Sequence, residues 1–339
     1  MNALTSLLNR AFDKNIPSLD PKYPCKQEVH RLIQSWLPSA DRPLASAASH
    51  HFSQPGKMLR AEMALRAASA FQVEREAAVY WAASIEVLHN ASLIHDDICD
   101  GDKQRRGQQS VWTKFGRNAA LALGDWLISV SFQLASHAAD KANAPRLVRL
   151  LAQHMATTTA GEALEFEMDH VLDWNTYFKI ASDKTTPLLT APIQGIAVMA
   201  GDIRSEVTVG HYFNDLGQAY QIANDILNFN GCDGAELIAG DLARRAPNAV
   251  VVSFKEILKG AQLTKFQNWF DSGDNLELTF WKNEILRSEA MKGASQRMFV
   301  LLKRAERKAG NLDFEFVDSI APVHSLIQKL CMASVAEKV

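Results

Sequence analysis

The sequence contains few of the residues that mark disulfide-rich or zinc-stabilised proteins. Its 339 residues include only four cysteines, which lie far apart and form no CxxC pair. This distribution excludes a disulfide framework and a zinc cluster, and it fits the reducing cytosol. The stretch MNALTSLLNRAFDKN at the N-terminus lacks the apolar core and cleavage site of a secretory signal, and it is typical of a short amphipathic helix.

The sequence also lacks an excess of charge of either sign. The 36 Lys and Arg residues nearly balance the 38 Asp and Glu residues, for a formal net charge of −2. A general nucleic-acid-binding protein needs a basic excess for its phosphate contacts, so we expect no nucleic-acid partner. The most apolar stretches, around AALALGDWLISVSF and PLLTAPIQGIAVMAG, are too short or too interrupted to span a bilayer. We therefore expect no transmembrane segment and a cytoplasmic location.

Glycine and proline are sparse, at 17 and 11 residues, and strand-like runs are rare. Apolar residues instead recur every three or four positions through most of the chain, which predicts helices. Several of these helices are apolar on most of their circumference, as helices inside a bundle are. We expect one all-α domain over residues 1–339, with a final helix from about 314 to 335. Breaks are expected at the stretches 18–24, 37–43, 101–110 and 231–241.

Three carboxylates gather in DDICD, residues 96–100. Asp96 and Asp100 are four positions apart and share a helix face, while Asp97 adds a charge on a neighbouring face. Like charges repel at this spacing, and the end of a helix disfavours anions. A hard cation such as Mg²⁺, which binds one or two carboxylates together with water and phosphate oxygens, would relieve the repulsion. The alternative is a solvated acidic end of a surface helix.

Two basic pairs lie near this acidic stretch in the sequence. Arg105 and Arg106 form the RRG stretch at 105–107, and forked guanidinium groups suit phosphate oxygens. Lys57 and Arg60 open a helix, where basic residues are unfavourable unless an anion lies between them and the exposed N–H groups. Taken alone, these two are better explained as surface charges. Beside three carboxylates, the arginine pair indicates a metal-bound polyphosphate.

A second stretch, NDILN at 224–228, repeats the frame of DDICD with less charge. Asn224 and Asn228 share one helix face, while Asp225 is rotated by about 100° onto the flank. An asparagine carbonyl can bind Mg²⁺, but two negative charges are missing. We therefore expect a second metal site that is altered rather than intact.

Taken together, the motifs make the chain resemble the trans-isoprenyl diphosphate synthases, the polyprenyl synthetase family. The matching stretches run in the family's order over nearly the whole chain. They are GKMLR (56–60), HNASLIHDDICD (89–100), RRG (105–107), FG (115–116), GD (124–125), GE (161–162), KTTPLL (184–189), YQIANDILN (220–228) and GDLARRAP (240–247). The resemblance implies the isoprenoid synthase fold, a bundle of mostly antiparallel helices around a deep central cavity. It also implies a homodimer.

The resemblance implies a role for each matching residue. The first metal site would hold two or three Mg²⁺ ions together with the allylic diphosphate, through Asp96, Asp97 and Asp100. The altered second site would be formed by Asn224, Asp225 and Asn228. The diphosphate of the allylic substrate would contact Arg105 and Lys184. Isopentenyl diphosphate would be held by Lys57, Arg60, His89 and Arg106, and the reacting ends would lie near Thr185 and Gln221.

The implied reaction is the ionisation of an allylic prenyl diphosphate and its condensation with isopentenyl diphosphate. In this family a bulky residue four or five positions before the first aspartate limits product length. The chain has the small residues Ser92 and Ala91 there, which predicts a product of C15–C20 or longer. Leu88 and Val87, deeper in the same helix, could still close the cavity.

The chain departs from the family at several places, and two alternatives stay open. Class I terpene cyclases pair DDxxD with NDxxSxxxE, and NDILN begins in that way, but Asn228 and Cys232 occupy the Ser and Glu positions. A weakly active partner subunit of a synthase is the other alternative. Asp233 could supply part of the missing charge. Further departures are Glu162 for a frequent Gln, Trp112 for a frequent His, and Asn248-Ala249-Val250 for Thr-Leu-Pro.

Overall fold

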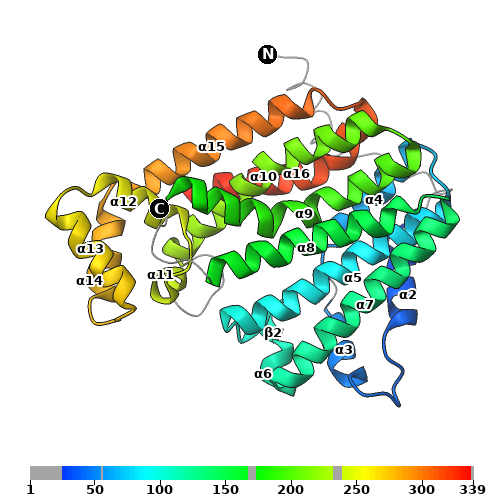
Figure 1. Ribbon diagram of the computed structural model, residues 1–339, viewed down its shortest axis with the longest axis horizontal. Helices are drawn as coiled ribbons and strands as arrows, with labels where there is room; N and C mark the ends of the chain where they lie inside the picture. The colour runs from blue at the N-terminus through cyan, green and yellow to red at the C-terminus, as the bar shows by residue number, and fades with distance from the viewer. Residues whose placement is uncertain (1–24, 55, 167–172, 232–238, 337–339) are drawn as a thin grey trace. The chain divides into compact units, whose positions relative to one another are not determined.

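The computed structural model describes residues 25–54, 56–166, 173–231 and 239–336. Within these ranges the chain forms fifteen α-helices and one two-stranded hairpin (Figure 1). The all-α prediction is confirmed. The last helix, α16 (Phe314–Val335), has the bounds predicted from the sequence, and the predicted break at 37–43 separates the first two described helices. The expected break at 18–24 and most of the one at 231–241 lie outside the described residues.

The chain divides into two compact units, each assembled from separate stretches of sequence. One unit comprises Met1–Met155, Thr190–Val209 and Leu312–Val323, and the other comprises Ala156–Leu189, Gly210–Asn311 and His324–Val339. They are named unit 1 and unit 2 below. The single domain over residues 1–339 and the deep central cavity stay predictions.

Unit 1 is built around one long buried helix. Its complete elements are α2 (Lys26–Trp36), α3 (Ala45–Phe52), α4 (Leu59–Ala70), α5 (Arg75–Asp100), β1 (Gln104–Arg105), β2 (Gln108–Gln109), α6 (Val111–Phe115) and α7 (Arg117–Lys141). Helix α5 packs against α4 and, along much of its length, against α7. Its Trp81 is fully buried and donates a hydrogen bond of 3.2 Å to the carbonyl of Pro192. The same helix ends at DDICD, so the core of unit 1 positions the acidic motif.

Helix α7, which contains the stretch AALALGDWLISVSF, is the one helix among the described residues that is long and apolar enough to cross a membrane, so the expectation that this stretch is too short does not hold for the helix. Length and composition alone do not distinguish a membrane span from the core helix of a bundle. In the structure its Leu123, Leu127 and Leu134 are fully buried. Packing against α5 therefore accounts for the apolar composition that the sequence shows.

A tight hairpin follows α5. The helix ends at Gly101, whose φ of 73° is left-handed, and β1 then pairs with β2 through Arg105 and Gln108. The two residues between them, Arg106 and Gly107, have φ angles of 55° and 76°. Positive φ at both central positions is the signature of a type I′ turn, which matches the twist of paired strands. The turn explains the glycine of the RRG stretch.

Unit 2 combines parts of longer helices with a helical C-terminal half. It contains α11 (Gly240–Arg244), α12 (Ala249–Ile257), α13 (Ala261–Ser272), α14 (Leu278–Arg287) and α15 (Ala290–Ala309). The two units share α8 (Arg146–Phe166), α9 (Trp174–Ala200), α10 (Ile203–Asn230) and α16. Aromatic rings of α12, α13 and α14 pack in one cluster formed by Phe254, Phe266, Trp269, Phe270 and Trp281.

Candidate active site

The first aspartate motif occupies the last turn of α5, and its three carboxylates face different surroundings. Asp96 and Asp100 are half-buried, whereas Asp97 is only 1% exposed. The predicted shared face of Asp96 and Asp100 is therefore a partly open face, and Asp97 points inward. This is the arrangement expected of a carboxylate pair that meets a ligand while the residue between them belongs to the core.

Arg105 is held by the buried carboxylate of this motif. Its Nε donates to Asp97 Oδ1 at 2.7 Å, its Nη2 donates to the same oxygen, and Asp102 Oδ2 lies 3.4 Å from Nη2. Burial raises the pKa of Asp97 to about 6, against the opposing effect of Arg105. The other oxygen, Asp97 Oδ2, is buried without a hydrogen-bond partner in the described part of the chain. The hairpin arginine is thus locked to the end of α5, which supports a positioning role for Asp97 beside the metal role predicted for it.

Three of the four predicted isopentenyl diphosphate residues, His89, Arg60 and Arg106, lie close together in unit 1. Burial and the charges of Arg60 and Arg106 lower the pKa of His89 well below its ordinary value, so its imidazole is neutral at pH 7. Lys57 is exposed just before α4, and Arg60 is half-buried in its first turn. Arg60 of GKMLR and Arg106 of the hairpin therefore bring two cationic groups close to the neutral imidazole of His89 in α5, while the place of Lys57 beside them stays a prediction.

Three residues around this basic cluster were not singled out from the sequence. Glu86 is buried and accepts a hydrogen bond of 2.9 Å from the Ala61 N–H; burial raises the pKa of this carboxyl, while the charge of Arg60 opposes the shift. Asn90 accepts from Arg106 Nη2 at 3.3 Å and also from His51 Nε2 at 2.9 Å. Asn90 and His51 are neutral and leave no charge pattern in a single sequence, whereas Glu86 is a carboxylate within an apolar run, which is a signal that could have been noticed.

Glycines explain two of the short motifs. In GD, a Cβ on Gly124 would overlap the imidazole of His95, so the glycine lets α7 approach α5 one residue before Asp96. In GE, a Cβ on Gly161 would lie 2.7 Å from both Asp183 Cβ and the backbone nitrogen of Lys184. Each glycine thus removes a side chain where a second helix carries a predicted site residue.

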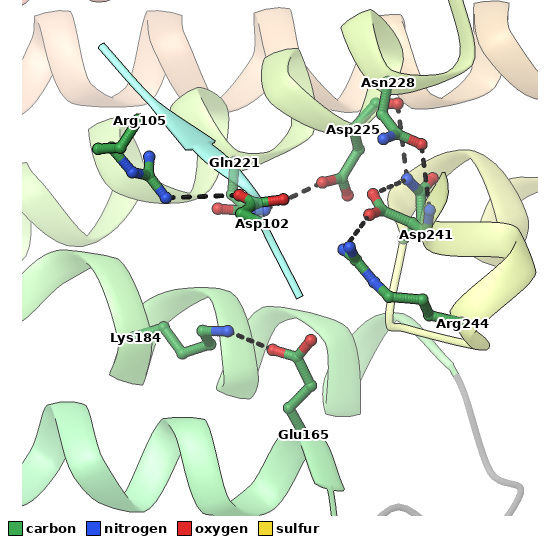
Figure 2. A network of polar contacts seen from close by, with 10 residues as sticks. Asp102, Arg105, Glu165, Lys184, Gln221, Asp225, Asn228, Asp241 and Arg244 are labelled. Carbon is green, nitrogen blue, oxygen red and sulfur yellow. Dashed lines mark hydrogen bonds and ion pairs between the residues drawn. The ribbon is translucent and has the colours of Figure 1, made fainter. Parts of the chain in front are cut away.

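Lys184, on α9 in unit 2, is held between two carboxylates of α8. Its Nζ lies 2.7 Å from Glu162 Oε2 and also pairs with Glu165 (Figure 2). Burial works against the charged ammonium group, but Glu165 and Glu162 outweigh it and raise the pKa of Lys184. Glu162 Oε1 is buried and has no hydrogen-bond partner among the described residues. The neighbouring Thr185 is half-buried, and its Cγ2 would lie 3.6 Å from a Cβ on Gly217 of α10.

The surviving carboxylate of the second motif lies inside the protein. Asp225 is 1% exposed; its Oδ2 accepts from Tyr177 Oη and from the Ala249 N–H, each at 2.7 Å, and its Oδ1 accepts from Gln221 Nε2 at 3.0 Å. Burial, reinforced by the charge of Asp241, raises the pKa of Asp225 to about 8. The predicted flank position of Asp225 thus faces the start of α12 and the core. Gln221, predicted near the reacting ends, is one of its donors.

Asn228 of the second motif joins the same polar network (Figure 2). Asn228 Oδ1 accepts from the backbone N–H of Asp241 at 3.4 Å, and the Asp241 carboxylate accepts from Arg244 and Asn248 at 2.9 Å each. Asn224 is half-buried. Cys232 and Asp233 lie outside the described residues, so the compensating role suggested for Asp233 stays a prediction.

The donor set fits a hard divalent cation better in unit 1 than at NDILN. Asp96 and Asp100 are half-buried on a shared face, and the orphaned Asp97 Oδ2 lies in the same turn. At NDILN the one carboxylate is occupied by three donors. Among the described residues, the side chains include no ready-made cluster of three or more His, Cys, Asp or Glu. Any metal here would therefore take part of its coordination from a ligand, as Mg²⁺ does with phosphate oxygens.

Comparison with known proteins adds to this geometry. The family model described as polyprenyl synthetase matches residues 41–277. A geranylgeranyl diphosphate synthase of Sulfolobus acidocaldarius is 32% identical over 241 residues, which cover 68% of this chain and 72% of that protein.

Solved structures share the fold over nearly the full length. A decaprenyl diphosphate synthase from Rhodobacter capsulatus has a TM-score of 0.79 at 22% identity and covers 98% of this chain and 99% of its own. A polyprenyl synthase from Caulobacter crescentus, complexed with calcium and isoprenyl diphosphate, has a TM-score of 0.77 at 21% identity, with 99% and 98% covered. At these identities the likeness shows the fold, and the predicted isoprenoid synthase architecture is confirmed.

Proposed function

The chain belongs to the polyprenyl synthetase family and is a chain-elongating prenyltransferase, and we propose that it condenses an allylic prenyl diphosphate with isopentenyl diphosphate, with Mg²⁺ as its metal. The observation that carries the proposal lies within unit 1. There the half-buried Asp96 and Asp100 lie in the same helix as His89, and the charges of Arg60 and Arg106 act on that histidine. The acidic face suits a diphosphate that is bound through metal ions, and the basic residues suit a second diphosphate that is bound directly.

Each residue would contribute a distinct part of the chemistry. Asp96 and Asp100 would hold the Mg²⁺ ions, which neutralise the charge that develops on a departing diphosphate. Arg105, fixed by Asp97, would donate to oxygens of the allylic diphosphate, and Lys184 is proposed to contact the same group. Thr185 and Gln221 keep their predicted places near the reacting ends as proposals.

The second substrate supplies the electrons for the new bond. Lys57, Arg60 and Arg106 would bind the diphosphate of isopentenyl diphosphate, and the neutral His89 would donate to it without adding charge. Its C=C bond then attacks the allylic cation to form the carbon–carbon bond. A proton leaves to diphosphate or a nearby polar group, which restores a double bond in the longer product.

The basic cluster also bears on the alternative of a terpene cyclase. A cyclase binds no isopentenyl diphosphate, so it has no use for a group of cations around a neutral histidine. The altered NDILN is the feature that favours the alternative, because it begins like the cyclase motif NDxxSxxxE. We propose a product of C15–C20 or longer and a cytoplasmic location.

Product analysis tests this function. The purified protein is incubated with Mg²⁺ and isopentenyl diphosphate, separately with dimethylallyl, geranyl and farnesyl diphosphate. Longer linear diphosphates are the expected products. Hydrocarbons or terpene alcohols formed from an allylic diphosphate alone would replace elongation with cyclisation, and no turnover with any substrate would favour a partner subunit.

The metal assignment has a separate test. Asp96→Ala removes a proposed ligand from a half-buried face, so it should nearly abolish turnover while leaving the unfolding temperature close to that of the wild type. Asp102→Ala is the matched control: it removes a neighbouring carboxylate that lies beyond the end of α5 and contacts Arg105 at 3.4 Å, and it should reduce turnover far less than Asp96→Ala. Wild-type turnover in Asp96→Ala would contradict the metal site.

A further inference from the structure

A buried hydrogen-bond relay connects α3 to the hairpin arginine. His51 of α3 is 4% exposed and Asn90 of α5 is 5% exposed. His51 Nε2 lies 2.9 Å from Asn90 Oδ1, and Arg106 Nη2 donates to the same oxygen at 3.3 Å. One side-chain carbonyl thus receives two donors, one from a histidine of the core and one from a cation of the proposed substrate site.

The direction of this relay is fixed by the amide of Asn90. Its Nδ2 donates to the carbonyl of Glu86 at 2.7 Å, so the oxygen is the end that faces His51 and Arg106. An amide oxygen only accepts, and the His51 Nε2 must therefore carry the proton. Burial lowers the pKa of His51 to about 4, with Arg106, Arg105 and His50 adding repulsion, so the ring is a neutral donor at pH 7.

Among the described residues, the guanidinium of Arg106 has one further hydrogen bond, and it also lies in the field of the buried Glu86 carboxyl. Nη1 donates to the carbonyl of Gln54 at 3.0 Å, and a Cβ on Gly56 would lie 2.9 Å from Nη2, so the glycine leaves room for the group. The backbone of Arg106 is left-handed, with a φ of 55°. A residue kept in that conformation at a site needs its surroundings to determine it. The type I′ turn does so for the backbone, and Asn90 is the side-chain acceptor that orients the guanidinium.

We propose that His51 is a positioning residue for the isopentenyl diphosphate site: it fixes the carbonyl of Asn90, which in turn orients the guanidinium of Arg106. The inference rests on the proposed function, because it assigns a substrate to Arg106. Without the His51 donor, one lone pair of a buried carbonyl is unsatisfied, and the amide gains by turning away from its present geometry. The Arg106 group then loses its side-chain acceptor, while the metal-binding aspartates keep their surroundings.

A pair of substitutions separates the donor from the volume of the ring. His51→Leu removes the donor but retains an apolar side chain of similar size, whereas His51→Gln keeps an N–H that can reach Asn90. We expect His51→Leu to raise KM for isopentenyl diphosphate about tenfold, because it removes one hydrogen bond that helps to hold the charged Arg106. KM for the allylic substrate should change by less than about twofold. His51→Gln should restore most of the loss.

Unit 1 contains a matched control for a purely structural histidine. His154 of α8 lies 2.8 Å from Gln194 Oε1, and Gln194 Nε2 donates to the carbonyl of Glu206 at 2.8 Å. Burial lowers the pKa of His154 to about 4, as it does for His51. His154→Leu should therefore lower the free energy of unfolding about as much as His51→Leu does, and it should leave both KM values unchanged.

Direct binding of isopentenyl diphosphate, measured by calorimetry without allylic substrate, keeps the inference distinct from the proposed function. If the wild type binds and His51→Leu binds equally tightly, the relay is overturned and the function stands. The relay is also overturned if His51→Leu and His154→Leu raise both KM values alike. If the wild type neither binds nor consumes isopentenyl diphosphate, the proposed function fails, and the relay fails with it.

Discussion

At the scale of single residues, aspartates have different surroundings in the two similar motifs DDICD and NDILN. The carboxylates of Asp96 and Asp100 are half-buried on one face, whereas Asp225 is buried and receives three hydrogen bonds. One of these comes from the Ala249 N–H at the first turn of α12, so Asp225 links α10 to the start of that helix. The residue is better explained as a structural hydrogen-bond acceptor than as a metal ligand.

Substituting Asp225 by Asn tests this role. Asparagine keeps the oxygen that Tyr177 and Ala249 need, so Asp225→Asn should retain turnover within about threefold of the wild type. Asp225→Ala leaves buried donors unpaired and should lower the free energy of unfolding by about 1–3 kcal/mol. A metal ligand would behave differently, because Asp225→Asn would then raise the Mg²⁺ requirement without any change in stability.

The raised pKa of Asp225 adds a pH signature to the same variant. Burial raises the folded-state pKa from 3.8 to about 8, so between these values the folded protein binds a proton that the unfolded chain releases. The contribution of this group to stability therefore falls as the pH rises from about 4 to about 8. Denaturant unfolding at pH 5 and pH 8 should show the wild type losing stability relative to Asp225→Asn. A constant difference would contradict the shift.

At the scale of elements, helix pairs that approach closely position the charged groups. Gly161 lets α8 lie against α9 at Asp183 and Lys184, which places Glu162 and Glu165 on either side of the lysine ammonium group. This contact explains why a glycine precedes a charged residue in GE. The charge pair depends on the backbone distance between two helices.

Gly161→Ala should separate these helices. The new Cβ would lie 2.7 Å from the backbone nitrogen of Lys184, and a backbone neighbour cannot rotate away. We expect a loss of about 1–3 kcal/mol in the free energy of unfolding, typical of overpacking. Gly293→Ala on α15 is the control, since its Cβ would meet only the rotatable hydroxyl end of Ser253 and a helix gains from alanine. Equal stability of the two variants would refute the close approach.

Two neighbouring small residues of α5, Ala91 and Ser92, differ in how deeply their side chains are buried. Ala91 is fully buried, whereas Ser92 is half-buried and donates its hydroxyl to the carbonyl of His89 at 2.9 Å. Both were predicted to leave room for a long product. Ser92 is thus the residue of the two whose side chain has space to change.

A phenylalanine at each position should act in different ways. Ser92→Phe should shorten the main product by at least one isoprene unit at little cost in stability. Ala91→Phe should mainly destabilise the protein, by about 1–3 kcal/mol, because it overpacks a filled core position. Chromatography of the dephosphorylated products and thermal unfolding give both readouts. Unchanged product length in Ser92→Phe would remove that residue from the chain-length pocket.

At the scale of the whole molecule, periodicity determined what the sequence could predict. The shared face of Asp96 and Asp100, the flank position of Asp225 and the bounds of α16 all follow from 3.6 residues per turn. The hydrogen-bond partners of these residues do not follow from this periodicity. Asp225 meets Tyr177 at a separation of 48 residues, and His51 meets Asn90 at 39. Such contacts depend on how helices pack, and neutral polar side chains leave no pattern that would reveal them.

The assembly of the chain is the last point that the sequence left as a prediction. A homodimer is expected from the family resemblance, and a partner subunit is the alternative that the altered NDILN leaves open. The two differ in what the chain does when purified alone. Light scattering should give twice the chain mass of 37.5 kDa, and this species should elongate substrate without any second protein. A monomer that gains activity only with a separate synthase chain would establish the partner-subunit role instead. An active dimer would show that the basic cluster and the half-buried aspartates suffice although NDILN is altered.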